Sequence, residues 1–281
     1  DALETIGDFA FSECTGIVTL HLPDALKTVG EEAFAGCTGI VDLHLPDTLR
    51  AIDYGAFQMC SGIVSLHLPD ALETIGDFAF SECTGIVDLH LPDALEAVGR
   101  CAFDRCSGIV DIHLPDTLRA IGEDAFFGCS GIVALHLPDA LRSIDNGAFQ
   151  DCSGIVDLHL PDALEAIGDF AFSGCTGIVD LNLPDALKTI GDRAFENCSE
   201  LTRVLAPDAL VRGELANPAM VFMGCPVLAG AGLTPYSAVP PLRRTLWHPT
   251  MHSWCTPGQR DRVLAVLVSE LRSDRQEEEE G

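Results

Sequence analysis

Residues 70–92 read DALETIGDFAFSECTGIVDLHLP, and close copies of this stretch follow one another along most of the chain. Each copy spans twenty-three residues, and nine copies begin at an aspartate, at positions 1, 24, 47, 70, 93, 116, 139, 162 and 185. A unit this short cannot bury its apolar face alone, so neighbouring units have to stack on one another. The sequence therefore predicts a repeat solenoid.

The two halves of the unit differ in the spacing of their apolar residues. In the first unit the second half ends in Leu20-x-Leu22, a period-two alternation that predicts a strand with one buried face. Between Ile6 and Cys14 the apolar residues recur at intervals of three to four, which predicts a short helical turn that packs inward. We expect the core to lie between these two segments.

The pattern I-G-x-x-A-F-x-x-C, present here as Ile6-Gly7, Ala10-Phe11 and Cys14 and followed by a strand that ends in proline, resembles the BspA-like leucine-rich repeats. The resemblance covers residues 1–207 fully and residues 208–230 in decayed form. It implies a right-handed coil with one parallel β-sheet on its concave side and short helical turns on its convex side.

Four segments follow from this reading. Residues 1–207 hold nine repeats, and residues 208–230 form a degenerate capping repeat. Residues 231–256 form a connector that contains proline and tryptophan, and residues 257–281 form an amphipathic helix with an acidic end. The tail is similar to a short segment found behind repeat regions in algal and other protist proteins, through Trp247, Pro249, His252, Pro257, Arg260 and Val263.

One histidine recurs at the same place in seven units. If Leu20 and Leu22 point inward, the residues at positions 19 and 21 of the unit point outward on the concave face. The predicted histidine column is His21, His44, His67, His90, His113, His136 and His159. The acidic residues predicted beside it are Asp42, Asp88, Asp111, Asp157 and Asp180. Together they form the candidate binding face.

Three interpretations of this face remain open. The histidines can be a by-product of duplication, since residues 1–18 and 70–87 are identical even at exposed positions. The face can bind a protein or peptide, which is the usual role of a solenoid's concave surface. It can also form a metal- or pH-responsive surface, because imidazoles and carboxylates bind zinc, copper and nickel.

The charge balance excludes some partners. The chain has 43 acidic and 16 basic residues, a net charge of −27, with 47% hydrophobic residues. This composition argues against nucleic acid and against an anionic membrane surface. No apolar run reaches the length of a membrane span. Every candidate acid or base is repeated, so we expect a non-enzymatic scaffold without a cofactor, whose oligomeric state the sequence leaves open.

Ten of the twelve cysteines occupy one repeat position, Cys14 and its equivalents through Cys225. Stacked equivalents point in parallel, which does not suit a disulfide, so we expect buried free thiols. Unpaired cysteines favour the cytoplasm. The sequence starts with an ordinary repeat and no cap, so we expect residues before it, which leaves a surface or secreted location open.

The tail contains one further arrangement of possible ligands. His248, His252 and Cys255 have zinc-type donor atoms, but no fourth ligand is evident in the sequence. We keep these residues as metal candidates only and predict no metal site there.

Overall fold

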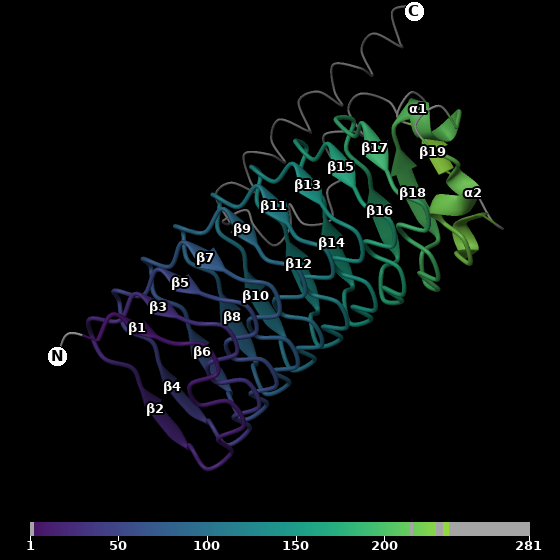
Figure 1. Ribbon diagram of the computed structural model, residues 1–281. Helices are drawn as coiled ribbons and strands as arrows, with labels where there is room; N and C mark the ends of the chain where they lie inside the picture. The colour runs from purple at the N-terminus through teal and green to yellow at the C-terminus, as the bar shows by residue number, and fades with distance from the viewer. Residues whose placement is uncertain (1–2, 214–215, 229–232, 236–281) are drawn as a thin grey trace, which may run out of the picture. The chain divides into compact units, whose positions relative to one another are not determined.

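The computed structural model describes residues 3–213, 216–228 and 233–235. The chain divides into two units, Asp1–Tyr236 and Ser237–Gly281, and the second unit lies outside the described residues. The predictions for the amphipathic helix, for most of the connector and for the tail similarity therefore concern parts of the chain that the structure does not describe. In the first unit the repeats form a parallel β-solenoid (Figure 1).

Each coil contributes a strand of two residues near its start. These strands pair in parallel, in chain order, into one nine-stranded sheet. They are β1 (Thr5–Ile6), β3 (Thr28–Val29), β5 (Ala51–Ile52), β7 (Thr74–Ile75), β9 (Ala97–Val98), β11 (Ala120–Ile121), β13 (Ser143–Ile144), β15 (Ala166–Ile167) and β17 (Thr189–Ile190). In every strand the second residue is buried, which sets this sheet against the core.

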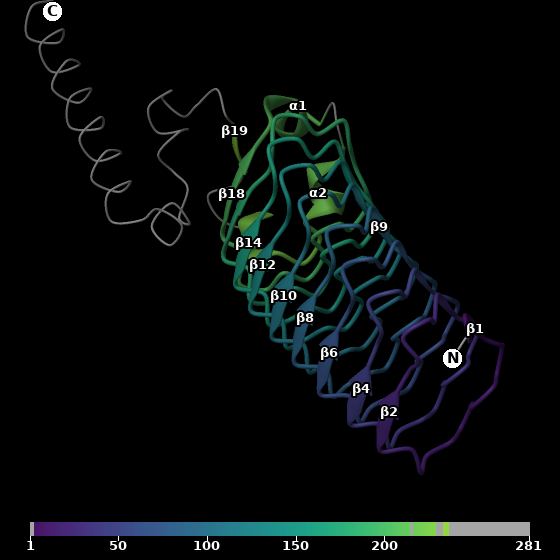
Figure 2. The same cartoon turned by 90° about the vertical axis from the view of Figure 1, so that its left-hand side faces the viewer.

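Each coil contributes a second strand at the position where the alternation predicted one. These strands are β2 (Thr19–His21), β4 (Asp42–His44), β6 (Ser65–His67), β8 (Asp88–His90), β10 (Asp111–His113), β12 (Ala134–His136), β14 (Asp157–His159), β16 (Asp180–Asn182) and β18 (Arg203–Ala206). They form parallel ladders, β2 to β10, β12 with β14, and β16 with β18 and β19. Figure 2 shows β2 to β14 along one side of the coil, with β1 and β9 on the other. The sequence predicted one column of strands, whereas each coil contributes two strands and the solenoid has two strand columns.

The segment between the two strands differs from the predicted helical turn. In the coil that starts at residue 70 it is a run of hydrogen-bonded turns, in which Phe78 and Glu82 have φ of 58° and 60°. Alternate N–H groups point to the next coil, as from Phe80 N to Ala102 O at 2.8 Å. A helix would use those N–H groups within its own segment, so the intercoil bonds exclude it.

A glycine column lies where the coils approach most closely. At Gly39, Gly62, Gly85, Gly108 and their equivalents through Gly177, an added Cβ would lie 2.1–2.6 Å from a backbone oxygen of the preceding coil. None of these glycines has a positive φ, so close approach, and not backbone conformation, requires them. At Gly16, in the first coil, nothing lies within 4 Å.

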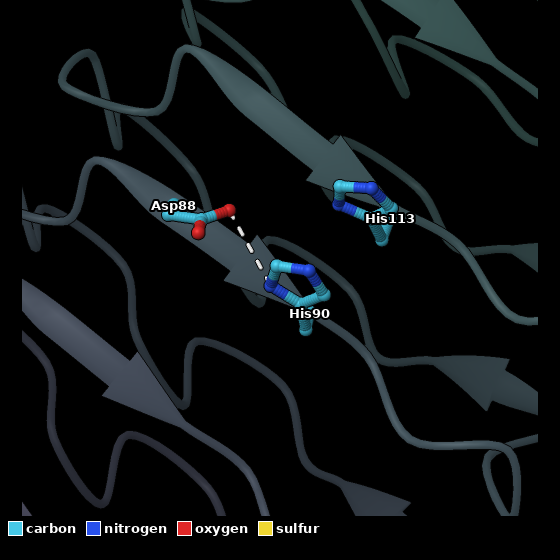
Figure 3. Close-up of side chains that lie close together, drawn as sticks. All are labelled: Asp88, His90 and His113. Atoms are coloured by element: carbon cyan, nitrogen blue, oxygen red, sulfur yellow. Dashed lines mark ion pairs between the residues drawn. The ribbon is translucent and has the colours of Figure 1, made fainter.

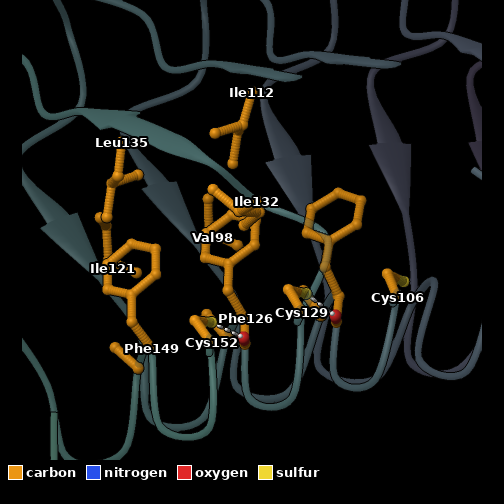
Figure 4. Close-up of a cluster of buried hydrophobic side chains, with 14 of the residues drawn as sticks. Val98, Cys106, Ile112, Ile121, Phe126, Cys129, Ile132, Leu135, Phe149 and Cys152 are labelled. Carbon is orange, nitrogen blue, oxygen red and sulfur yellow. Dashed lines mark hydrogen bonds between the residues drawn. The ribbon is translucent and has the colours of Figure 1, made fainter. Parts of the chain in front are cut away.

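The core is a set of columns of identical side chains. Phe34 and its equivalents through Phe195 are fully buried, and successive rings stack at 5.2–5.4 Å. Each buried cysteine of the repeat column donates its S–H to a phenylalanine carbonyl of the preceding coil, as from Cys129 to Phe103 at 3.1 Å (Figure 4). The predicted buried, unpaired thiols are confirmed for the described cysteines, except that Cys14 is exposed.

The array changes character after β18. Helices α1 (Asp208–Val211) and α2 (Pro218–Val221), the 3-10 helix η1 (Pro226–Leu228) and strand β19 (Leu233–Pro235) follow in order. The repeat core nevertheless continues, because Phe222 stacks on Phe195 at 5.6 Å and Cys225 donates to the Phe195 carbonyl. We therefore expect residues 208–230 to close the core, as the decayed repeat predicted.

Candidate functional site

The predicted histidine column lies on the strands β2 to β14, each histidine being the third residue of its strand. The middle residue of each strand points into the core, so its neighbours point outward. His21, His44, His67, His90 and His113 are exposed, and His136 and His159 are half-buried. The sequence therefore placed the imidazoles on the correct side of the strand.

Imidazoles of neighbouring coils stack on one another. His21 and His44 have ring centroids 4.2 Å apart with planes at 9°, and His90 and His113 are 4.1 Å apart at 7°. Both pairs lie on strands in direct register, where His44 pairs with His21 and His113 with His90. The parallel register of the ladder brings these rings together, because it repeats the same side chain on the neighbouring strand.

The aspartates of the predicted acidic column flank these rings. Nδ1 of His90 lies 3.4 Å from Oδ1 of Asp88, two residues earlier on the same strand (Figure 3). Nδ1 of His44 lies 3.5 Å from Oδ1 of Asp42. In the unit between these, Ser65 takes the place of the aspartate, and its hydroxyl oxygen is 3.3 Å from Nδ1 of His67.

The acidic column changes towards its C-terminal end. Asp42, Asp88, Asp111 and Asp157 are exposed, whereas Asp180 is half-buried and forms a bidentate ion pair with Arg203 of the next strand. Asn182 replaces the histidine in that coil. The exposed carboxylates of the column are therefore those of the earlier coils.

A column of exposed valines runs beside the histidines, and the sequence analysis gave it no role. These valines immediately precede the strands and are 39–60% exposed. They are Val18, Val41, Val64, Val87, Val110, Val133, Val156 and Val179. Two consecutive outward residues, such as Val87 and Asp88, break the alternation that the strand shows afterwards. We call the valine, aspartate and histidine columns together the histidine face.

The outward side of the nine-stranded sheet has a different chemistry. The residue before each two-residue strand is charged, and opposite charges pair between coils, as in Lys27–Glu4 and Arg50–Glu73 at 2.9 and 2.8 Å. Lys188 pairs with Glu165, and this contact lowers the pKa of the Glu165 carboxyl. Several of the basic side chains of the repeats are thus used on this side, away from the aspartates of the histidine face.

Most of the buried cysteines do not have the properties of a nucleophile. Burial raises the pKa of Cys60 to about 12 and that of Cys101 to about 11. A thiol with so high a pKa has very little thiolate at neutral pH, and the thiolate is the reactive form. Asp104 is buried as well, which raises its pKa, and its Oδ1 is the one buried side-chain oxygen without a hydrogen-bond partner in the described chain.

The metal candidates His248, His252 and Cys255 lie outside the described residues. Within the described part, one group of side chains brings three possible metal ligands within 4.8 Å of one another, namely Asp88, His90 and His113. The described helices include none that is long and apolar enough to cross a membrane.

The repeat pattern and the coil it forms match a known family. The BspA type leucine rich repeat region matches residues 1–110 and 102–213. The chain belongs to the BspA-type leucine-rich repeat family. This confirms the resemblance drawn from the repeat motif, and members of this family are repeat scaffolds. No curated protein matches the chain significantly.

The chain matches solved structures of leucine-rich repeat proteins. A leucine-rich repeat protein from Bacteroides ovatus is 28% identical with a TM-score of 0.70, over 73% of this chain and 53% of that one. The T. pallidum leucine rich repeat protein is 28% identical with a TM-score of 0.46, over 63% and 72% of the two chains. A leucine rich cell surface protein from Faecalibacterium prausnitzii is 20% identical with a TM-score of 0.44, over 84% and 78%. This chain thus spans about half the length of the Bacteroides ovatus protein.

Proposed function

We propose that this protein is a non-enzymatic scaffold that binds a protein or peptide through the histidine face. The observation that carries the proposal is the valine column, because exposed apolar side chains in eight successive coils form a continuous stripe. Continuous apolar surface on a soluble domain marks an interaction site more often than scattered apolar residues do. Duplication explains why the valines repeat, but it does not make their exposure favourable.

The side chains of the histidine face indicate which side chains a partner would need. Apolar side chains would cover the valines, and basic side chains would pair with the exposed carboxylates of Asp42, Asp88, Asp111 and Asp157. The net charge of −27 favours the approach of a basic segment and opposes that of an acidic one. We therefore expect a peptide segment that alternates apolar and basic residues, and no nucleic acid.

The absence of catalysis follows from the uniformity of the face. A catalytic site needs one differentiated set of acid, base and nucleophile, whereas the histidine face repeats the same groups from coil to coil. The described cysteines, apart from Cys14, are buried, which removes the strongest nucleophile from this surface.

A peptide selection tests the proposal. Random peptides would be selected on the immobilised full chain and their affinities measured by fluorescence anisotropy. The face variant Val87→Thr/Val110→Thr/Val133→Thr replaces three exposed methyl groups by hydroxyls, which should weaken binding about 50-fold at ~0.8 kcal/mol for each buried carbon. The control variant Ala97→Ser/Ala120→Ser, on the nine-stranded sheet, should bind as the unchanged protein does.

Selected peptides that bind the face variant as tightly as the unchanged chain would refute the proposal. So would peptides that lose affinity only for the control variant, because they would place the binding surface on the nine-stranded sheet. Equal stability of all three proteins in thermal unfolding has to accompany the comparison, so that a folding defect is not read as a binding defect.

The cysteines do not decide the compartment. Apart from Cys14, which is exposed, and Cys225, whose pKa is lowered by its contact with Cys198, the described thiols of the column are buried and have raised pKa values. These thiols should be slow to oxidise, so they would persist in oxidising surroundings as well as in the cytoplasm. The preference for the cytoplasm drawn from unpaired cysteines therefore loses its basis. We propose that the protein can act at a cell surface as well as inside the cell.

A further inference from the structure

The coils that carry β8 and β10 are unlike the others on the histidine face. They are the only two successive repeats that each have both the aspartate and the histidine, namely Asp88 with His90 and Asp111 with His113. Register pairs Asp111 with Asp88 and His113 with His90, so four possible ligands lie on two adjacent strands. Elsewhere a threonine, serine, alanine or asparagine interrupts the set.

The distance between two of these ligand atoms matches that between two ligands of one metal ion, and a third ligand atom lies nearby. Two zinc–ligand bonds of about 2.1 Å at the tetrahedral angle hold the two ligand atoms about 3.4 Å apart. Nδ1 of His90 and Oδ1 of Asp88 are 3.4 Å apart. A ligand atom of His113 completes a group of three within 4.8 Å (Figure 3).

From this arrangement we infer that Asp88, His90 and His113, with Asp111 beside them, form a binding site for a divalent transition metal, with zinc as the reference ion. Imidazole nitrogen and carboxylate oxygen are ligands that zinc takes in proteins. The carboxylates of Asp88 and Asp111 offset the charge of the bound ion.

The stacked rings are the main obstacle to this site, and they can move. The planes of His90 and His113 differ by only 7°, so their nitrogen lone pairs run side by side and do not converge. Rotation about the bond from Cβ to the ring has a broad, shallow energy profile. His90 and Asp88 are 60% and 59% exposed, and His113 is also exposed, so no packed neighbour prevents the turn.

Calorimetric titration of the metal-free full chain with zinc chloride near pH 7.5 tests the site. The unchanged protein should bind zinc with a component that is lost in His90→Asn/His113→Asn. Removing a ligand should cost at least as much as removing a residue that supports one, about 10- to 100-fold in affinity. Asp88→Asn/Asp111→Asn should weaken the same component by about 10-fold or more.

The matched control is His21→Asn/His44→Asn. It removes the other stacked pair, 4.2 Å apart, from coils in which Thr19 takes the place of one aspartate. Zinc binding in this control within about threefold of the unchanged protein supports a discrete site between β8 and β10. All the substituted residues are exposed, so thermal unfolding should be unchanged by each substitution.

Three results would overturn the inference. One is no binding heat in the unchanged protein, and another is equal heat in His90→Asn/His113→Asn, which would place any bound zinc elsewhere, for example at His248, His252 and Cys255. The third is an equal loss in both histidine variants, which would mean that the whole column binds metal weakly without a defined site. None of these results depends on peptide binding to the face.

Discussion

Replacing Gly108 by alanine should disrupt the stacking of the coils in the middle of the array. The added Cβ would lie 2.3 Å from Thr84 O and 2.7 Å from Ile86 O, both in the preceding coil. A carbon–oxygen contact is normally about 3.3 Å or longer, so the two coils would have to separate by about 0.6–1 Å. The atoms in the way are backbone, which a rotamer change cannot move.

The separation of the two coils determines how much the substitution lowers the free energy of unfolding. Val110 N donates to Val87 O at 2.9 Å, and the shift would take this bond to the limit of a hydrogen bond or beyond. Losing two or three intercoil bonds at about 1 kcal/mol each, with a packing loss of about 1–3 kcal/mol, predicts a destabilisation of about 3–6 kcal/mol. Urea unfolding followed by circular dichroism measures it.

Two controls separate the steric clash from other effects. Gly16→Ala is the same change in the coil where nothing lies within 4 Å, and it should be neutral or stabilise by about 0.4–1 kcal/mol. Ser107→Ala changes the adjacent exposed residue in the middle of the array and should stay within about 0.5 kcal/mol. A midpoint for Gly108→Ala equal to that of Ser107→Ala would refute the reasoning.

Three further predictions rest on other features of the coil. Gly128 has φ of +68°, but a Cβ added there would make only ordinary contacts. Gly128→Ala should therefore reduce the free energy of unfolding by about 1 kcal/mol in urea, and Gly128→Asn by less. Equal costs would contradict the backbone explanation. Phe126 lies within the buried stack, so Phe126→Ala should destabilise the protein by about 3–5 kcal/mol. Phe11 is 44% exposed and has one stacked neighbour, so Phe11→Ala should destabilise it clearly less. Similar losses would mean that stacking is not what stabilises the core. Burial raises the pKa of Cys60 from 9.0 to about 12, so the thiol loses its proton at lower pH in the unfolded chain than in the folded one. The free energy of unfolding should therefore fall between about pH 9 and 12. Cys60→Ala should flatten this decline in thermal melts, and an unchanged slope would argue against the role of Cys60.

The strand that carries the histidines was predictable because its alternation is long enough to read. Leu20 and Leu22 define the inward side, and the outward place of His21 follows from them. The strand of two residues, such as Thr5–Ile6, was not predictable, since two residues show no period. Its pairing depends on the neighbouring coils, which a single repeat does not reveal.

The positions with positive φ could have been recognised from glycines in the sequence, although the spacing of the apolar residues does not reveal them. Gly55 and Gly147 occupy the place of Phe78, and Gly36 and Gly128 occupy that of Glu82. Glycine at one position in some repeats indicates a positive φ there in all of them, which is incompatible with the predicted helical turn. The apolar spacing suited both structures, so the glycines were the deciding evidence.

The candidate site was predictable in part. The sequence placed the imidazoles and carboxylates on one surface, but it gave no sign that Val87 and Asp88 would both point outward. The difference between the β8 and β10 coils and the rest can be read from the sequence. Only these two successive repeats each have both the aspartate and the histidine, namely Asp88 with His90 and Asp111 with His113. The 3.4 Å separation of Asp88 and His90 depends on side-chain rotamers and needed the structure.

The intercoil hydrogen bonds run in both directions along the axis. In the turns the N–H groups point towards the following coil, as from Phe34 N to Ala56 O, whereas near the short strands they point back, as from Gly30 N to Ile6 O. Peptide dipoles of opposite direction cancel, unlike those of an α-helix, which add up to partial charges at its two ends. A coil added to the array therefore adds little axial dipole, so the stack does not build up opposite partial charges at its two ends as a long α-helix does.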